Sequence, residues 1–286
     1  MRKSGKPTTA LTERSFYRAG PDHRSVLGGV IPDFLTIRQL FDFRGVEIGR
    51  WVTQDEQEHA AACFYDALCD LAQILAGQPL PTAKALRLRR ELISLRGTLA
   101  LQYGRGGRPG VSAHYSPLQR SFALAKNAGP GSIAHEWFHA FDHYMATKAF
   151  TGAPAMSFAS SLWLQNKSAT EHPLNTLLGD CFKAILLSVD GNDPSPLFIA
   201  SAAQDKALNI HYYSQPEELC ARAFEAFIQD ASIKNVFLVK GSKASAEAQS
   251  GLYPQDEQRR TINLAFSRYF SALCQALLRQ PTEFNR

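Results

Sequence analysis

Two histidines and a glutamate near the middle of the chain have the spacing of a metal-binding helix. His135, Glu136 and His139 form an HExxH motif within residues 132–145. On an α-helix, residues four apart lie about one turn apart on one face, so the two imidazoles can bind one metal ion. Glu136, about 100° around the helix, has the position of a general base. The motif therefore predicts a metal centre for hydrolysis. The alternative is an amphipathic helix with a solvated face, but this face carries three histidines and no lysine or arginine.

A catalytic zinc ion takes three protein ligands and a water, so the HExxH motif leaves one ligand to be found. His143 lies on the same face, but about 12 Å along the helix axis from His135, which is too far to share an ion with it. We expect His143 to support the site or to pack against it. Asp142 is a candidate to orient a ligand histidine, because such rings usually donate their free N–H to a carboxylate; the alternative is an acid on the helix surface.

One stripe of a later helix, which opens at Pro216, carries polar side chains. It consists of Glu218, Arg222, Glu225 and Gln229. The stripe is either the source of the missing carboxylate, with Glu218 as the ligand, or a solvated face with an ion pair between Glu218 and Arg222. In the first case Arg222 and Glu225 would support the ligands.

The elements that must position these residues are helices and a few short strands. Apolar spacing and capping residues predict helices over residues 53–76, 173–187, 197–208, 216–230 and 254–278, and alternation predicts strands over 98–103, 111–115 and 120–126. The glycine-rich residues 104–110 would be the tip of a hairpin between the first two strands. We therefore expect an α+β, mostly helical fold, with a small antiparallel sheet packed on the HExxH helix and a helical C-terminal half.

The strand over residues 120–126 has a predicted role in substrate binding. Arg120, Phe122 and Leu124 would line the cleft, and the strand would pair with an extended peptide by strand addition. The alternative is a strand inside the sheet.

The basic, aperiodic residues 1–25 predict a flexible arm. Residues 26–286 predict a single domain with a helix and sheet part (26–147) and a helical part (148–286).

Composition limits the class of protein. The 286 residues are 45% hydrophobic and 20% charged, as in ordinary globular proteins. The net charge of +5 gathers partly in residues 84–108, which makes nucleic acid a candidate partner; the alternative is a solvated surface. The five cysteines lack disulfide or zinc spacing, and no apolar run reaches the roughly 18 residues of a membrane span. We expect a cytoplasmic protein without a membrane partner.

Two blocks of the sequence resemble the metallopeptidase domain of anthrax lethal factor, a gluzincin. HEWFHAFDHY resembles its HExGHxxDxY signature, and PEELCARAF resembles its ExxAxAF signature. The resemblance implies that His135, His139 and Glu218 bind Zn²⁺ and that Glu136 is the general base. Phe138 replaces the glycine of the first signature.

That family also has a tyrosine seven residues before the ligand glutamate, which stabilises the oxyanion. The corresponding residue here is His211, followed by Tyr212 and Tyr213. The resemblance therefore implies this role for Tyr212 or Tyr213.

A wider resemblance extends from about Leu40 to the end of the chain. FDFRGVEIGRWV, YDALCDLA, AHYSP, GPGSIAHEWFHAFDHY and SQPEELCARAFEAF are similar to a large polyvalent-protein-associated domain of mobile elements and to the bacterial CLCA-X family. The resemblance implies a bacterial protein with a zincin-like domain. The function it implies is a zinc-dependent metallopeptidase acting on a peptide or protein substrate. The alternative is a catalytically inactive zincin-fold binding module, associated with nucleic acid and linked to mobile elements.

Overall fold

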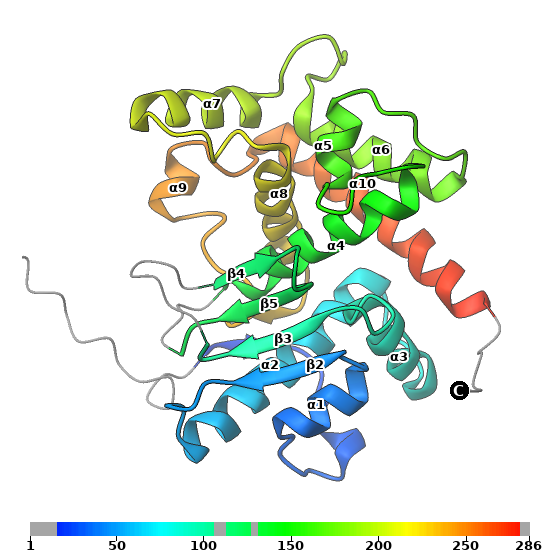
Figure 1. Cartoon of the computed structure of the whole chain (residues 1–286), viewed down its shortest axis with the longest axis vertical. Helices are drawn as coiled ribbons and strands as arrows, with labels where there is room; N and C mark the ends of the chain where they lie inside the picture. The colour runs from blue at the N-terminus through cyan, green and yellow to red at the C-terminus, as the bar shows by residue number, and fades with distance from the viewer. Residues whose placement is uncertain (1–15, 106–112, 127–130, 281–286) are drawn as a thin grey trace, which may run out of the picture.

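The structure is a computed structural model, which describes residues 16–105, 113–126 and 131–280. It confirms the predicted α+β, mostly helical fold (Figure 1). The helices are α1 (Phe34–Phe41), α2 (Gln54–Ala76), α3 (Thr82–Leu88), α4 (Ile133–Ala149), α5 (Ala159–Leu164), α6 (Pro173–Leu186), α7 (Pro196–Leu208), α8 (Pro216–Asp230), α9 (Ala246–Gln249) and α10 (Asp256–Arg279), with a 3-10 helix η2 (Ser25–Leu27) and a π-helix η3 (Arg89–Ile93). Among the described residues, no helix is both long and apolar enough to cross a membrane.

Four strands form the main sheet, in the order β2 (Gly45–Ile48), β3 (Ala100–Tyr103), β5 (Ser121–Leu124) and β4 (Ala113–Ser116). The first three are parallel to one another, and only β4 runs antiparallel, against β5. Figure 1 shows β2 beside α1 at one side of the sheet and β4 beside α4 at the other. The sheet thus connects the N-terminal helices to the helix that carries the HExxH motif.

The prediction of an antiparallel sheet holds for the pairing of β4 with β5 but not for β3, which is parallel to β5. It took β3 and β4 as a hairpin, whereas β3 pairs with β2 and β5 and makes no pair with β4. The chain leaves β3, begins β4 at the outer edge, and then returns through β5 between the two. Alternation of side chains reveals that a segment is a strand, but it does not reveal the strand's neighbours. The loop of the predicted hairpin tip lies largely outside the described residues.

The apolar face of α4 packs against α8 and α10. Trp137 and Phe138 have ring centroids 5.4 and 4.9 Å from that of Phe224 on α8, and Phe141 lies 5.4 Å from Phe270 on α10. Burying one such aromatic side chain stabilises the fold by roughly 2–3 kcal/mol. Because this face is fixed in the core, the opposite, histidine-bearing face of α4 is held in one direction.

The described part of the predicted flexible arm is bound to the rest of the protein. β1 (Arg18–Ala19) pairs antiparallel with β6 (Lys234–Asn235), and Arg18 and His23 donate to the fully buried Asp70 of α2 at 2.7–2.9 Å. The prediction of a flexible arm was therefore wrong for residues 16–25. The sequence alone does not show that a buried carboxylate is the partner of these basic residues. Residues 1–15 lie outside the described residues.

Candidate metal centre

The start of α4 is positioned by backbone contacts. The predicted cap, Ser132, makes no side-chain capping bond; instead the N–H groups of Gly131 and Ala134 donate to the carbonyls of Phe237 and Leu238. Gly131 has φ of 100°, and a Cβ there would lie 2.5 Å from the backbone N of Lys240. Only glycine fits this approach, which anchors the first turn of α4 immediately before the HExxH motif.

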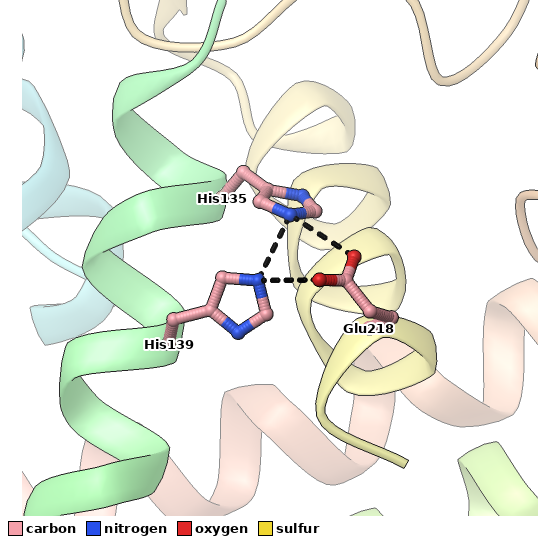
Figure 2. A group of neighbouring side chains, drawn as sticks. All are labelled: His135, His139 and Glu218. Carbon is pink, nitrogen blue, oxygen red and sulfur yellow. Dashed lines mark hydrogen bonds and ion pairs between the residues drawn. The ribbon is translucent and has the colours of Figure 1, made fainter. Parts of the chain in front are cut away.

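The two motif histidines and Glu218 converge from α4 and α8 on one point (Figure 2). His135 Nε2 lies 3.0 Å from His139 Nε2 and 3.4 Å from Glu218 Oε2, and His139 Nε2 lies 3.3 Å from Glu218 Oε1. Ligand atoms about 2.1 Å from a tetrahedral metal stand about 3.4 Å from one another. The separations are therefore close to those of a coordinated triangle, so the stripe on α8 is not a solvated face.

The chemistry of this donor set fits a divalent cation. Two imidazole nitrogens face each other at 3.0 Å, a contact that is favourable only with a proton or a cation between them. Glu218 Oε2 is buried and has no hydrogen-bond partner among the described residues. A metal ion would satisfy this oxygen and both ring nitrogens at once.

Glu225 lies on the other side of His135. Its Oε2 is 3.4 Å from His135 Nδ1 and accepts a hydrogen bond from Tyr253 at 2.8 Å. Although burial opposes a charge on His135, contacts with the Glu218 and Glu225 carboxylates raise its pKa well above the usual value. The predicted supporting role of Glu225 thus has a geometric basis. Tyr253 was not predicted, because nothing in its sequence neighbourhood relates it to α8.

Glu136 lines the same cavity of about 480 Å³ as the three converging residues. Burial raises the pKa of its carboxyl group above the usual value, and the nearby histidines oppose part of this shift. A raised pKa brings a carboxylate closer to the range in which it can both take and return a proton at neutral pH. Glu136 therefore lies beside the three converging residues, where the predicted general base would have to be.

Of the two candidate tyrosines, only Tyr212 lines this cavity. Desolvation of the hydroxyl and the Glu218 carboxylate raise the pKa of Tyr212, although the residue is 44% exposed. Like any tyrosine hydroxyl at neutral pH, it is protonated and can donate a hydrogen bond. Tyr213 instead lies with its ring 5.4 Å from the guanidinium carbon of Arg222. Tyr212, rather than Tyr213, is therefore the candidate tyrosine that lies at this cavity.

Three predicted supporting residues make other contacts. Asp142 accepts from Ser160 N and Oγ at 2.9 and 2.5 Å and so joins α5 to α4, and His139 Nδ1 has no hydrogen-bond partner among the described residues, so Asp142 does not orient this ring here. The two ring nitrogens of His143 contact the Tyr115 hydroxyl and the Ala155 carbonyl, both at 2.7 Å, and Arg222 donates to the Ser201 hydroxyl and the Tyr213 carbonyl. These polar groups join the elements around the site, because each helical turn of α4 and α8 meets a different neighbour.

The predicted role of β5 in substrate binding was wrong. β5 lies between β3 and β4, so both of its edges are paired, and Phe122 and Leu124 are buried. Arg120 does not line the cavity of the metal centre. The edge strand there is β4, whose residues 113–115 line the cavity. The AHYSP block contains these residues, but its pattern alone gave no reason to place them at the site.

The C-terminal part of the chain matches one known family. The model of Large polyvalent protein-associated domain 1 matches residues 204–277, from α7 to α10, which include Glu218 but not the HExxH helix. The predicted resemblance to a large polyvalent-protein-associated domain is therefore confirmed over these residues. Comparison with curated proteins and with solved structures gives no match.

Proposed function

We propose that this protein is a zinc-dependent metallopeptidase of the gluzincin type. The observation that carries the proposal is the convergence of His135, His139 and Glu218 at 3.0–3.4 Å, with Glu136 in the same cavity. Two neutral imidazoles and one carboxylate are a typical ligand set of a catalytic zinc ion, with room for a water as fourth ligand. Zinc held there would polarise the scissile carbonyl and make the attacking water more acidic.

Different parts of the protein would have different roles in the reaction. Glu136 takes a proton from the water as the water oxygen adds to the carbonyl carbon. It then passes this proton to the amine as the C–N bond breaks. Tyr212 donates a hydrogen bond to the carbonyl oxygen as negative charge develops on it. The edge of β4 would bind the extended peptide through backbone hydrogen bonds, and the surrounding side chains would then determine sequence preference.

The test is peptide cleavage by the zinc-loaded protein, with a mixed peptide library and mass-spectrometric detection. Glu136→Gln should abolish cleavage while zinc content stays at one ion per chain, because Glu136 is not a ligand. The matched control is Glu257→Gln, which changes an exposed carboxylate paired with Arg260 and should cleave like the wild type. Equal cleavage by the wild type and Glu136→Gln would refute the catalytic role, and zinc binding without any cleavage would favour the inactive binding module.

The basic residues within 84–108 give less support to nucleic-acid binding than their number suggests. Arg87 and Arg96 form ion pairs with Glu91, and Arg105 pairs with Glu47. Cations already paired within the protein release fewer counterions from DNA, so they contribute less to its binding. DNA retention that falls steeply with salt would reverse this preference.

We also propose that the protein works in the cytoplasm. All five cysteines are free thiols, and burial raises the pKa of each one. Buried, unpaired thiols are typical of proteins in reducing compartments.

A further inference from the structure

A second cavity, of about 250 Å³, lies between the N-terminal segment, α2 and α3. It shares no lining residue with the cavity of the metal centre. Most of its wall is apolar, and the apolar residues come from all three segments: Val26, Cys69, Ala72, Pro79, Leu80, Ala85 and Leu88. Such a wall suits a hydrocarbon group.

One charged side chain of this wall, Arg89, is buried without an acidic partner. Its residue is only 5% exposed, and among the described residues it forms no ion pair. Within the described part of the chain its single hydrogen bond, from Nη1 to the Tyr65 hydroxyl, is long at 3.4 Å, and its guanidinium carbon lies 5.8 Å from the centre of that ring. A buried cation is unfavourable unless an anion compensates it.

Two acidic residues, one on the cavity wall and one next to the wall residue Cys69 in the sequence, have other partners. Asp70 accepts hydrogen bonds from Arg18, His23 and Asn235. Asp22 lines the cavity but is exposed, and its carboxylate accepts from the backbone N–H of Arg24.

The backbone also changes at this position. The α3 helix becomes the π-helix η3 at Arg89 itself. Short π-helical segments insert an extra residue into a helix, which redirects the side chains that follow, and they occur often at functional sites. This irregularity is independent of the missing acidic partner, and both point to the same residue.

We propose that this cavity binds a small monocarboxylate with an apolar chain. The carboxylate pairs with the Arg89 guanidinium, whose planar fork of N–H donors suits two parallel hydrogen bonds. The chain of the ligand lies against the apolar wall. A volume of about 250 Å³ is that of about eight water molecules, and a six-carbon carboxylate has about the same number of non-hydrogen atoms.

The experiment compares hexanoate with 1-hexanol by isothermal titration calorimetry on the full chain. The wild type should bind hexanoate at least 10-fold more tightly than hexanol. Arg89→Gln should remove this preference, whereas Arg90→Gln, which changes the exposed neighbour, should keep it. Equal affinity for the two ligands in the wild type, or an unchanged preference in Arg89→Gln, would overturn the proposal.

A second variant tests the location without changing the charge. Ala85→Leu fills the cavity from α3 and should weaken hexanoate binding at least 10-fold. This variant also decides the question if Arg89→Gln does not fold. Hexanoate bound to a metal ion at the other site would be unaffected by Ala85→Leu, and that result would overturn the proposal.

Discussion

The contact between Glu225 and His135 gives a sharp prediction about metal affinity. Glu225 is 5% exposed, and its Oε2 faces His135 Nδ1 at 3.4 Å and the Tyr253 hydroxyl at 2.8 Å. The carboxylate favours the tautomer in which Nδ1 carries the proton and Nε2 is free to bind metal. Glu225→Gln keeps the size of the side chain but removes its charge, so it weakens this orientation while preserving the packing.

The expected magnitude follows from the geometry. Removing a partner that orients a metal-binding histidine typically lowers metal affinity 10- to 100-fold, which corresponds to about 1.4–2.7 kcal/mol. The 3.4 Å separation is longer than a strong hydrogen bond, so we expect the lower limit, about 10-fold. Tyr253→Phe removes only the donor that holds Glu225, and the loss of one such bond, about 0.7 kcal/mol, predicts a roughly threefold effect.

The assay is zinc titration in competition with a chromophoric chelator at neutral pH. Because Tyr253 acts through Glu225, the double variant should bind zinc no more weakly than Glu225→Gln alone. Glu247→Gln, an exposed change on α9, is the control and should match the wild type. An affinity loss below twofold for Glu225→Gln, or additive effects of the two substitutions, would refute the reasoning.

Three further predictions concern stability, catalysis and metal removal. Asp70→Asn should lower the unfolding free energy in urea by about 3–5 kcal/mol at pH 7, because it leaves Arg18 without its buried partner. Burial opposes a charge on Asp70, but hydrogen bonds from His23, Arg18 and Asn235 lower the pKa of its carboxyl group. The contribution of Asp70 to the unfolding free energy is therefore complete above about pH 4 and is lost as the pH falls through the folded-state pKa. The difference between Asp70→Asn and the wild type should accordingly shrink in acid. Tyr212→Phe should lower kcat about 100-fold with little change in KM in peptide assays, whereas Tyr213→Phe should lower it less than threefold. A chelator should lower the unfolding free energy of the zinc-loaded protein by about 2.7 kcal/mol when free zinc had been 100 times Kd, and an unchanged melting curve would contradict metal binding to the folded state.

The sequence was sufficient to predict the HExxH helix and the direction of its histidine-bearing face. The helical spacing of Trp137, Phe138 and Phe141 identified the face that must be buried, so the histidines had to lie on the other side. The predicted helix start at Pro216 was also confirmed. Helical periodicity is a local property, so it can be recognised in the sequence without knowledge of the tertiary contacts.

The contacts between elements were not predictable in this way. Asp142 and His143 lie at nearly the same angle on α4 as the two motif histidines, but their turns meet α5, Tyr115 and Ala155 rather than α8. A helical wheel gives the direction of a side chain, but not the element opposite each turn. The same limit explains the sheet, since the pattern of β5 does not reveal that β4 covers its outer edge.

The buried stripe of α8 supports the proposed cation site from the side opposite the HExxH helix. Glu218, Arg222 and Glu225 are each less than 9% exposed, although such side chains are rarely buried without partners. Arg222 has the Ser201 hydroxyl, the Tyr213 carbonyl and the Tyr213 ring, and Glu225 has the Tyr253 hydroxyl. Glu218 faces two imidazoles, whose Nε2 atoms must be free of protons if they bind metal. A buried carboxylate between two neutral imidazoles is unfavourable without positive charge, and a cation held by Glu218 and the two histidines would supply that charge.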